Sequence, residues 1–408
     1  MIIREIKIKN YSIHRDTKVE LSPLTVFVGP NGGGKSALFE ALLNFSVISR
    51  GNIRQVFNRF PFSFRATLHR GAVNPARINF TVEMAEKADS VESLSYHIEY
   101  AQNGTNEDYP EFTIFNERLI KNPGHQNLFD RTDPPEQLNG LLEDDRAYFS
   151  AVRQAQISNH KLQLDPLVEH CADKISKFNR FRLEPATLGL PSRLPEAPSG
   201  NRSASVPRIG YAGDDLASTL YYMQESSAPE LNIIKERIRE IEPNFLDFEF
   251  NTVGNDRIGF SLVFSDARRS ISAPRLSSGI LTFIGLVVLV ASPNRPTLMM
   301  IEEPENGLTP QAIHAFYKTL KALAENPDPT KRSQILISSH SPFVICEAWN
   351  GEDRNFIHQV KVVSAKSQVK KFSEVIKEQG IHLSKGEDGK RTHLSLKNAE
   401  EIMSGRFA

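Results

Sequence analysis

The chain has 408 residues, of which 39% are hydrophobic and 24% charged, so it is long enough for one large or two ordinary domains and its composition excludes wholesale disorder. Lysine plus arginine equals aspartate plus glutamate, 49 against 49, which excludes a bulk attraction to nucleic acid or acidic membranes and leaves only local patches for such contacts. The two cysteines, Cys171 and Cys346, form neither a metal-ligand spacing nor a disulfide framework, which favours a reducing compartment.

The sequence predicts a cytoplasmic protein with no membrane partner. Its first residues, MIIREIKIKNYSI, alternate charge with isoleucine and lack the apolar core of a secretion signal. The most apolar run, GILTFIGLVVLVAS, is shorter than the roughly 18 to 20 residues that a membrane span needs. This run is therefore expected to form a buried helix.

Strand patterns open the chain. The segments REIKIKN and TKVELS and the run from Leu24 to Val28 are rich in strand-forming residues, and the last of them ends at a glycine cluster. From Lys35 the pattern becomes helical, KSALFEALLNFSVIS, with apolar residues three and four positions apart. The glycines are therefore predicted to form the turn between a strand and a helix.

The middle of the chain predicts another sheet, then helices, then a loop. The segments ARINFTVEM, LSYHIEYA and EFTIFNERLI predict an antiparallel sheet beside the opening one. Helical patterns follow between Asp144 and Arg180, where LDPLVEHCADKISKF places its apolar residues on one face. The segment LPSRLPEAPSGNRSASVPRIGYAG, from Leu190, is dense in Pro, Ser, Gly and Arg, which is typical of a loop or mobile linker.

Regular structure resumes with the helix PELNIIKERIREI, the strands FLDFEF and RIGFSLVF, and the long apolar helix after Gly279. We expect an N-terminal lobe over residues 1–143, a helical insertion with a flexible loop over 144–225, and a C-terminal lobe over 226–408.

A phosphate-binding pattern, G-x-x-x-x-G-K-S, lies on the predicted strand-to-helix turn. Its residues, with the alanine that follows, are Gly29, Pro30, Asn31, Gly32, Gly33, Gly34, Lys35, Ser36 and Ala37. Glycine lets the backbone curl until successive N–H groups point at phosphate oxygens, while the following helix presents its positive end. Lys35 is expected to reach the β and γ phosphates of a nucleotide, and Ser36 is expected to ligate Mg²⁺.

A second buried strand supplies carboxylates. In TLMMIEEPENGL, the apolar run from Leu298 to Ile301 leaves Glu302 and Glu303 at its carboxyl end, where open α/β sheets place their ligands. Glu302 is the candidate for holding the Mg²⁺ shell, and Glu303 is the candidate general base for an attacking water. Two exposed acids at a strand end are the structural alternative.

Two weaker motifs bear on the class of nucleotide hydrolase. In RLSSGIL, Ser277 and Gly279 precede the apolar helix, whose free N–H groups can bind an anion. In QILISSHSP, an apolar strand ends at His340, where an imidazole could contact a γ phosphate. Alone, the first motif is better explained as an ordinary serine helix cap, and the second as a capping or core histidine.

The order of these four motifs resembles the ABC-type ATPases, in the branch of the RecF, structural-maintenance-of-chromosomes and overcoming-lysogenization-defect proteins. Compact bacterial members of this branch often lie beside defence genes. Connecting segments such as FRLEPATLGLPSR and GDDLASTLYYM are also similar, so the likeness covers most of the chain. The resemblance implies an α/β fold: a P-loop NTPase head of ABC type with a mixed sheet, an antiparallel β subdomain and a helical insertion.

The resemblance also implies roles. The glycine loop matches the Walker A motif, Glu302 and Glu303 match the Walker B carboxylate and the catalytic glutamate, and His340 matches the switch histidine. Ser277 and Gly279 match the signature loop, which in this branch binds the γ phosphate of the nucleotide held by the opposite subunit. ATP and Mg²⁺ are thus the expected cofactors, sandwiched between the two heads of a homodimer.

Several positions depart from the usual pattern. Glu302 stands where aspartate is commonest, and Ser278 and Ile280 replace a glycine and a polar residue of the signature. Thr309 stands where aspartate or histidine is usual, in the loop that links paired sites. Gln55 is only a guess for the glutamine loop.

Two features of these relatives are missing. No sustained heptads predict coiled-coil arms, and the stretch after His340 is too short for an appended nuclease domain. We therefore expect a regulatory ATPase that acts on a separate effector, a nuclease or toxin, in antiphage defence. The alternatives are a RecF-like ATPase that binds DNA in repair or senses DNA ends and, third, the ATPase subunit of a transporter.

One mixed patch is a candidate for nucleic-acid contact. It consists of Lys174, Lys177, Arg180 and Arg182, interleaved with Phe178 and Phe181. A solvated helix end with its aromatic residues in the core is the simpler interpretation.

Overall fold

The computed structural model describes residues 1–58, 64–72, 76–103, 111–138, 140–158, 162–195, 206–266, 269–328, 331–350, 357–363, 366–379, 381, 383–385 and 392–404. The chain forms two compact units. Unit 1 comprises residues 1–178, 353–382 and 403–408, and unit 2 comprises residues 179–352 and 383–402. The three regions predicted from the sequence, with boundaries after residues 143 and 225, stay a prediction.

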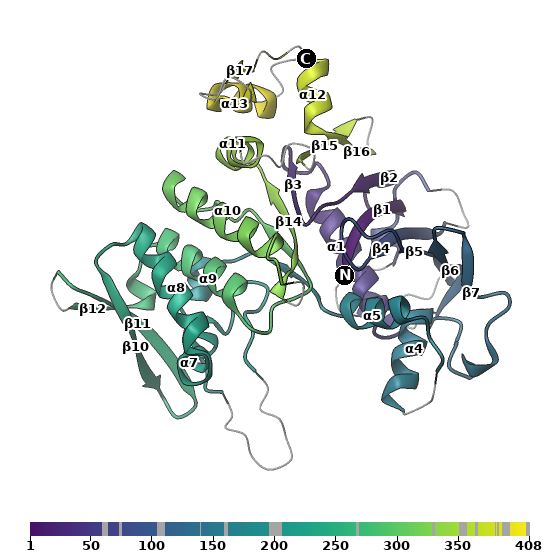
Figure 1. Ribbon diagram of the computed structural model, residues 1–408, viewed down its shortest axis with the longest axis horizontal. Helices are drawn as coiled ribbons and strands as arrows, with labels where there is room; N and C mark the ends of the chain where they lie inside the picture. Colours follow the sequence, from purple (N-terminus) through teal and green to yellow (C-terminus); the bar gives the residue numbers. More distant parts are fainter. Residues whose placement is uncertain are drawn as a thin grey trace. The chain divides into compact units, whose positions relative to one another are not determined.

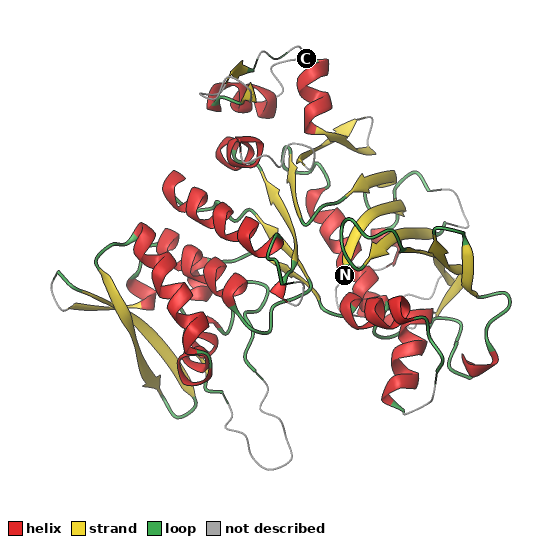
Figure 2. Cartoon of the chain, viewed as in Figure 1, coloured by secondary structure: helices red, strands yellow, loops and turns green. Residues whose placement is uncertain are grey.

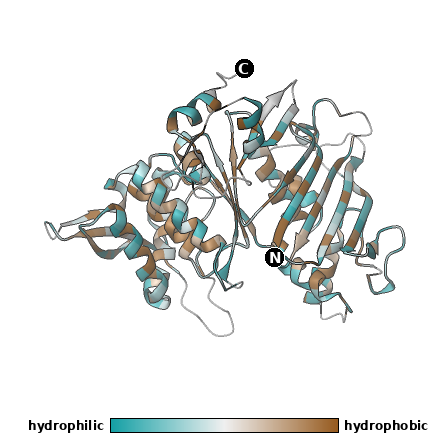
Figure 3. Ribbon diagram, turned by 45° about the horizontal axis from the view of Figure 1, so that its top comes forward, coloured by the Kyte–Doolittle hydropathy of each residue, from teal (hydrophilic) through white to brown (hydrophobic). Residues whose placement is uncertain are grey.

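Unit 1 contains a six-stranded antiparallel sheet with the order β2-β1-β4-β5-β6-β7 (Figure 1). Its strands are β1 (Ile2–Tyr11), β2 (His14–Glu20), β4 (Ile78–Ala85), β5 (Ser93–Asn103), β6 (Glu111–Asn122) and β7 (Gln126–Asp130). The antiparallel strands predicted from the middle of the chain are confirmed, but they share one sheet with the opening pair, because β4 pairs directly with β1. Apolar and polar residues alternate along the strands, as Figure 3 shows.

Helices cover the apolar face of this sheet. They are α1 (Lys35–Ile48), α4 (Tyr148–Ile157) and α5 (Pro166–Ile175), with the short α2 (Arg54–Asn58), α3 (Phe64–Thr67) and η1 (Glu136–Leu138) beside them. Phe45 on α1 meets Phe80 and Tyr96 of the sheet, and Phe149 on α4 packs 4.9 Å from Tyr96. These aromatic contacts form the core of the unit.

A three-stranded ladder in the same unit carries the glycine loop. It consists of β3 (Leu24–Val28), which pairs in parallel with β15 (Ile357–Val363), and β16 (Lys366–Lys371), which pairs antiparallel with β15. The helix α12 (Phe372–Glu378) follows. All residues of β3 are buried, and the strand leads into the glycine loop and then α1, as predicted.

Unit 2 contains a parallel pair and a small antiparallel sheet (Figure 2). The pair is β13 (Leu298–Glu302) and β14 (Gln334–Ser339), with β8 (Phe178–Phe181) next to β13. The small sheet consists of β10 (Phe245–Val253), β11 (Arg257–Phe264), β12 (Arg269–Ser272) and β9 (Ser192–Arg193). A further pair is β17 (Ser384–Lys385) and β18 (Thr392–His393).

The apolar run predicted to be a buried helix is α9, Ser278–Ala291, buried continuously from Leu281 to Val290. It packs against α6, α7, α8 and α10. These and the remaining helices are α6 (Pro185–Leu188), α7 (Leu216–Ser226), α8 (Ala228–Ile241), η2 (Ala273–Arg275), α10 (Pro310–Ala324), α11 (Pro342–Asn350) and α13 (Leu396–Ser404). Across the ranges described above, no helix combines the length and the hydropathy that a bilayer crossing requires.

The predicted loop from Leu190 is described only in part. Residues 196–205 lie outside the described residues, and a two-residue strand, β9, precedes them. Both cysteines are free thiols, Cys171 buried and Cys346 half-buried.

Candidate nucleotide site

The glycine loop joins β3 to α1 in a backbone conformation that only glycine adopts readily. Gly29, Gly32 and Gly34 have φ angles of 150°, 76° and 110°, and Gly34 is the residue that caps α1. A Cβ at Gly32 would meet no atom within 4 Å. The loop therefore leaves backbone N–H groups accessible at the start of a 14-residue helix, which is the arrangement that binds phosphate.

The hairpin of β15 and β16 supports the loop from behind. A Cβ at Gly29 would lie 2.0 Å from the carbonyl oxygen of Val360, and one at Gly33 would lie 2.7 Å from the same atom. The Ser367 hydroxyl donates a hydrogen bond of 2.9 Å to the Gly33 carbonyl. The glycines thus serve packing as well as phosphate binding, and the hairpin comes from a segment more than 300 positions away in the sequence.

Side chains of the motif keep the loop curled. The buried ammonium group of Lys35 donates hydrogen bonds to the carbonyl oxygens of Gly29 at 2.7 Å and Pro30 at 3.0 Å. A nucleotide phosphate can take over these contacts, because it offers stronger acceptors to the same cation. Ser36 is exposed, as its predicted role requires, and Ala37 is half-buried on the first turn of α1. Asn31 is exposed on the loop.

The carboxylates belong to unit 2, at the end of β13. Glu302 is the last residue of the strand and is buried, and Glu303 follows in the left-handed region with φ 46°. The backbone N–H of Glu303 donates to the Ser338 carbonyl at 2.8 Å, which fixes this turn. The Asn306 side chain donates to the Glu303 carboxylate at 3.2 Å. Glu303 thereby leaves the line of the strand, and its carboxylate stays partly accessible.

His340 lies beside these acids, at the end of β14. Its Nδ1 is 3.6 Å from the carboxylate of Glu303 and 3.8 Å from that of Glu305. Glu305 is buried, and one of its oxygens accepts hydrogen bonds from the Ser339 hydroxyl at 2.7 Å and from the backbone N–H of His340 at 3.2 Å. Within unit 2, the candidate base and the candidate switch histidine are therefore neighbours.

The signature loop caps α9. Ser277 is exposed, and its hydroxyl accepts a hydrogen bond of 3.3 Å from the backbone N–H of Ile280. A Cβ at Gly279 would lie 2.4 Å from the carbonyl oxygen of Gly307, in the loop after the carboxylates. The structure thus places Gly279 against this loop within the same chain, and Ser277 is exposed. Thr309 caps α10, with its hydroxyl accepting from the backbone N–H of Ala312 at 3.3 Å.

The basic patch predicted from the sequence is ion-paired. Lys174 and Lys177 both contact Asp173. Arg180 contacts Glu302, and Arg182 contacts Glu303 at 3.2 Å. Its two aromatic residues are buried in the core, as the simpler interpretation expected.

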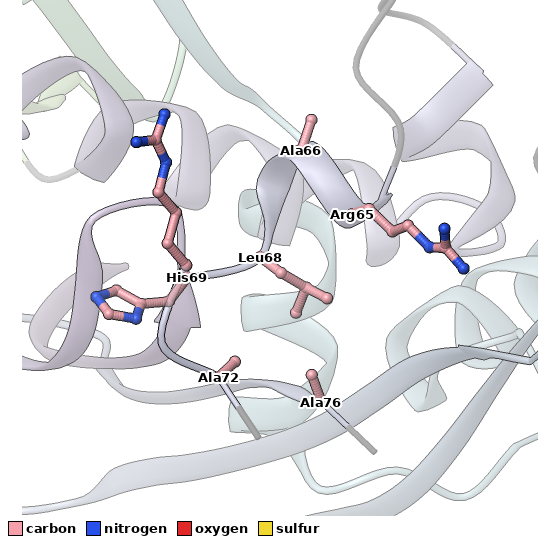
Figure 4. Close-up of a pocket in the computed structure, with 7 residues that line it drawn as sticks. Arg65, Ala66, Leu68, His69, Ala72 and Ala76 are labelled. Atoms are coloured by element: carbon pink, nitrogen blue, oxygen red, sulfur yellow. The ribbon is translucent and has the colours of Figure 1, made fainter. Parts of the chain in front are cut away.

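A hollow of about 500 Å³ lies in unit 1, around the segment that follows α3 (Figure 4). Its lining residues are Arg65, Ala66, Leu68, His69, Arg70, Ala72 and Ala76. His69 is buried, and its ring accepts the backbone N–H of Gly71 at 3.0 Å, whereas Figure 4 shows Arg65 pointing away from it.

Comparison with known proteins decides the family. Residues 24–346 match the family described as "AAA domain, putative AbiEii toxin, Type IV TA system". The chain belongs to this family. It is an ABC-type ATPase of the RecF and SMC-like branch, as the motifs predicted.

Relatives of this AAA-domain chain support the fold. It is 42% identical over 60 residues to the "DNA double-strand break repair Rad50 ATPase" of Methanococcus maripaludis, a match covering 14% of this chain and 6% of that protein. The structure of an SMC head bound to the C-winged helix domain of ScpA matches with a TM-score of 0.54 and 10% identity, covering 92% of this chain and all of the other. An SMC head domain from Thermotoga maritima matches with a TM-score of 0.46 and 14% identity, covering 91% of this chain and 99% of that one. The match with the ScpA-bound SMC head, whose TM-score exceeds 0.5, confirms the P-loop ATPase fold predicted from the sequence.

The donor set of this AAA-domain protein suits Mg²⁺. Across the described ranges, no cluster of three or more His, Cys, Asp or Glu side chains forms a metal cage. Mg²⁺ needs none, because it is usually held by one or two protein oxygens together with phosphate oxygens and waters. The Ser36 hydroxyl in unit 1 and the Glu302 carboxylate in unit 2 are oxygens of this kind, and their assignment to the metal stays a prediction.

The sequence analysis did not identify Glu305 as a site residue, and it considered Arg180 and Arg182 only as candidates for nucleic-acid contact. The third acid of EEPEN is visible in the sequence, but only the fold shows that it binds the end of β14. In the structure these two arginines form ion pairs with Glu302 and Glu303. No short-range pattern signals a contact between residues about 120 positions apart.

Proposed function

We propose that this ATPase is an ATP-driven clamp: two copies close on two ATP·Mg²⁺, and hydrolysis reopens them to control a separate effector. Two arrangements, one in each unit, support this proposal. Unit 1 holds a curled phosphate loop with Lys35 at its carbonyls, and unit 2 holds Glu303 beside His340.

In this mechanism the loop amides and Lys35 bind the phosphates. Ser36 and Glu302 would hold the shell of a Mg²⁺ ion, which would supply neutralisation of the phosphate charge. Glu303 accepts a proton from the attacking water as the general base. His340 reports the presence of the γ phosphate through its position beside Glu303. The exposed Ser277 end of α9 completes the nucleotide site of the opposite copy, because the free N–H groups of a helix start attract anions.

The family description supports a role in defence, since it refers to a toxin and a toxin–antitoxin system. A structure in which an SMC head binds a domain of another protein supports an effector on a separate chain. We therefore place the clamp upstream of a nuclease or toxin, whose activity the open and closed states would restrain or release.

A Glu303→Gln substitution tests the chemistry. It should leave ATP binding intact, trap the closed dimer and reduce turnover by about a hundredfold or more, because the carboxylate acts in the reaction and not in affinity. Nucleotide binding, dimer mass in ATP and phosphate release are measured together. Lys35→Ala is the matched variant, and it should weaken binding itself. Turnover at the original rate in the Glu303→Gln chain would show that the base is elsewhere.

The short likeness to Rad50 supports a second candidate, a DNA-stimulated ATPase. This candidate predicts that duplex DNA accelerates hydrolysis and that the acceleration falls steeply with salt. Hydrolysis that is indifferent to DNA at low salt would leave the effector clamp as the better proposal.

A further inference from the structure

Arg180 and Arg182 stand in a fixed segment beside the Walker B acids. The backbone N–H of Arg182 donates to the Tyr211 carbonyl at 2.8 Å, and that of Glu184 donates to the Ala212 carbonyl at 2.9 Å. The Arg180 guanidinium also lies 5.7 Å from the centre of the Tyr211 ring. Phe181, between the two arginines, is buried. These contacts fix the position of the segment that carries Arg180 and Arg182 beside the two acids.

The two ion pairs differ in strength. Arg180 donates from Nε to the Glu302 carboxylate, and the side chains of this pair are 17% and 3% exposed. Arg182 donates to Glu303 at 3.2 Å, and these side chains are 51% and 19% exposed. A partly buried charge-assisted contact is much harder to remove than an exposed one, because loss of one partner leaves the other charge without water. Arg180 is the strong contact, and Arg182 is the one that solvent competes for.

These contacts conflict with the roles of the acids in hydrolysis. A carboxylate oxygen that accepts from a guanidinium has fewer lone pairs for the shell of a metal. A Glu303 carboxylate that accepts from both Arg182 and Asn306 is likewise less able to accept from water. The positive charges of the arginines also offset the electrostatic repulsion between the neighbouring carboxylates of Glu302 and Glu303.

We propose that Arg180 and Arg182 form a counterion latch that occupies the Walker B acids until Mg²⁺ displaces it, so that the latch sets the metal concentration at which the site engages. This inference rests on the proposed function, in which Glu302 holds the metal shell. Mg²⁺ carries twice the charge of a guanidinium and arrives with the nucleotide, which gives it the advantage in this exchange. The latch thereby keeps Glu302 and Glu303 from engaging metal and water until the nucleotide and its Mg²⁺ bind.

The test measures metal binding directly. The full chain is saturated with a non-hydrolysable ATP analogue, and Mn²⁺, a spin-active substitute for Mg²⁺, is titrated in with free Mn²⁺ read by electron spin resonance. Arg180→Gln should lower the half-saturating Mn²⁺ concentration by about tenfold, and Arg182→Gln should lower it by about two- to fivefold, in line with the buried and exposed pairs. Arg237→Gln is the matched control, because Arg237 pairs with Glu240 on α8, and it should change nothing.

A half-saturating concentration that stays the same or rises in both variants overturns the latch. Should Arg180→Gln fail to fold, because it leaves Glu302 buried without its counterion, Arg182→Gln and the charge-retaining Arg180→Lys decide the question. Lysine lacks the planar fork of arginine, so Arg180→Lys should lie between the original chain and the fully released state.

Glu302→Gln separates the two ideas. If this substitution in the otherwise unaltered chain weakens Mn²⁺ binding while the arginine variants do not strengthen it, the metal site stands and the latch is wrong. If Glu302→Gln has no effect on Mn²⁺ binding, the assignment of Glu302 to the metal fails, and the latch fails with it.

Discussion

Acid should destabilise unit 1 through two buried histidines. His14 donates to the Gly34 carbonyl at 3.0 Å and contacts the Thr17 hydroxyl at 3.1 Å, and His358 contacts the Glu20 carbonyl at 2.8 Å. Burial lowers the pKa of His14 and that of His358 from 6.5 to about 4. Both rings are therefore neutral in the folded chain at neutral pH, and each donates from Nε2–H to its carbonyl.

The direction and the size of this change in stability follow from the uptake of protons by the two histidines. Between pH 6.5 and 4 the unfolded chain binds a proton at each position and the folded chain does not, so stability falls as the pH is lowered through this window. Below about pH 4 both states are protonated and the loss stops. At about 1.4 kcal/mol per pH unit, acidification from pH 7 to 5 should cost about 2 kcal/mol for each histidine. Two such losses are a large part of the 5–15 kcal/mol that typically holds a protein folded.

A His14→Gln substitution isolates one of the two terms. Glutamine can still donate to the Gly34 carbonyl and accept from Thr17, but it does not titrate. Urea unfolding at pH 7 and pH 5, followed by a probe in unit 1, should show that the variant loses about 2 kcal/mol less than the original chain. His314→Gln is the control, because His314 is 65% exposed and lies in unit 2.

Equal losses in the original and His14→Gln chains would refute the reasoning, since they would mean that the buried imidazole takes up its proton without unfolding. A greater loss in the variant would indicate that the hydrogen bonds, and not the titration, dominate. Nucleotide affinity at the two pH values is a further check, because His14 holds the last glycine of the phosphate loop.

Two substitutions in unit 2 give further predictions. Gly279→Ala should destabilise the fold by about 1–3 kcal/mol and abolish turnover, because the new Cβ meets the Gly307 carbonyl. A thermal unfolding scan measures the loss, and the control variant Ser278→Ala should show no change in stability. Glu305→Ala should cost about 1–3 kcal/mol and slow hydrolysis without changing the KM for ATP, because it leaves the Ser339 hydroxyl and the His340 N–H without their acceptor. Glu305→Gln, which keeps an acceptor oxygen, should recover most of the rate in steady-state kinetics.

Sequence patterns predicted correctly those parts of the fold that are formed by residues adjacent in the chain. The glycine loop was found because the strand, turn and helix that form it are contiguous, and α9 was found because its apolar run is continuous. Ser277 and Thr309 show the limit of this reasoning. Both residues cap helices through their hydroxyls. Any serine or threonine before a helix is a candidate for this role, so the sequence pattern could not distinguish a helix cap from a residue that contacts a nucleotide or links paired sites.

Contacts between distant segments were beyond prediction. The Val360 carbonyl explains why alanine cannot replace Gly29, but it comes from a strand whose pairing with β3 no local signal specifies. The joining of β1 to β4 in one sheet is of the same kind, because register depends on which apolar faces meet in the folded chain. Such contacts depend on chain topology, which single-sequence patterns do not carry.

The conformation of Glu303 bears on what limits turnover. A left-handed φ of 46° is unfavourable for a glutamate by about 1–2 kcal/mol, and the Ser338 carbonyl stabilises it by accepting the Glu303 N–H. The carboxylate is already held by Asn306 and Arg182 with His340 nearby. In the mechanism proposed above, Glu303 would therefore need no rearrangement of its backbone during the reaction. Control over the rate would then fall to the steps that remain in that mechanism, which are release of the arginine contact and closure of the two heads.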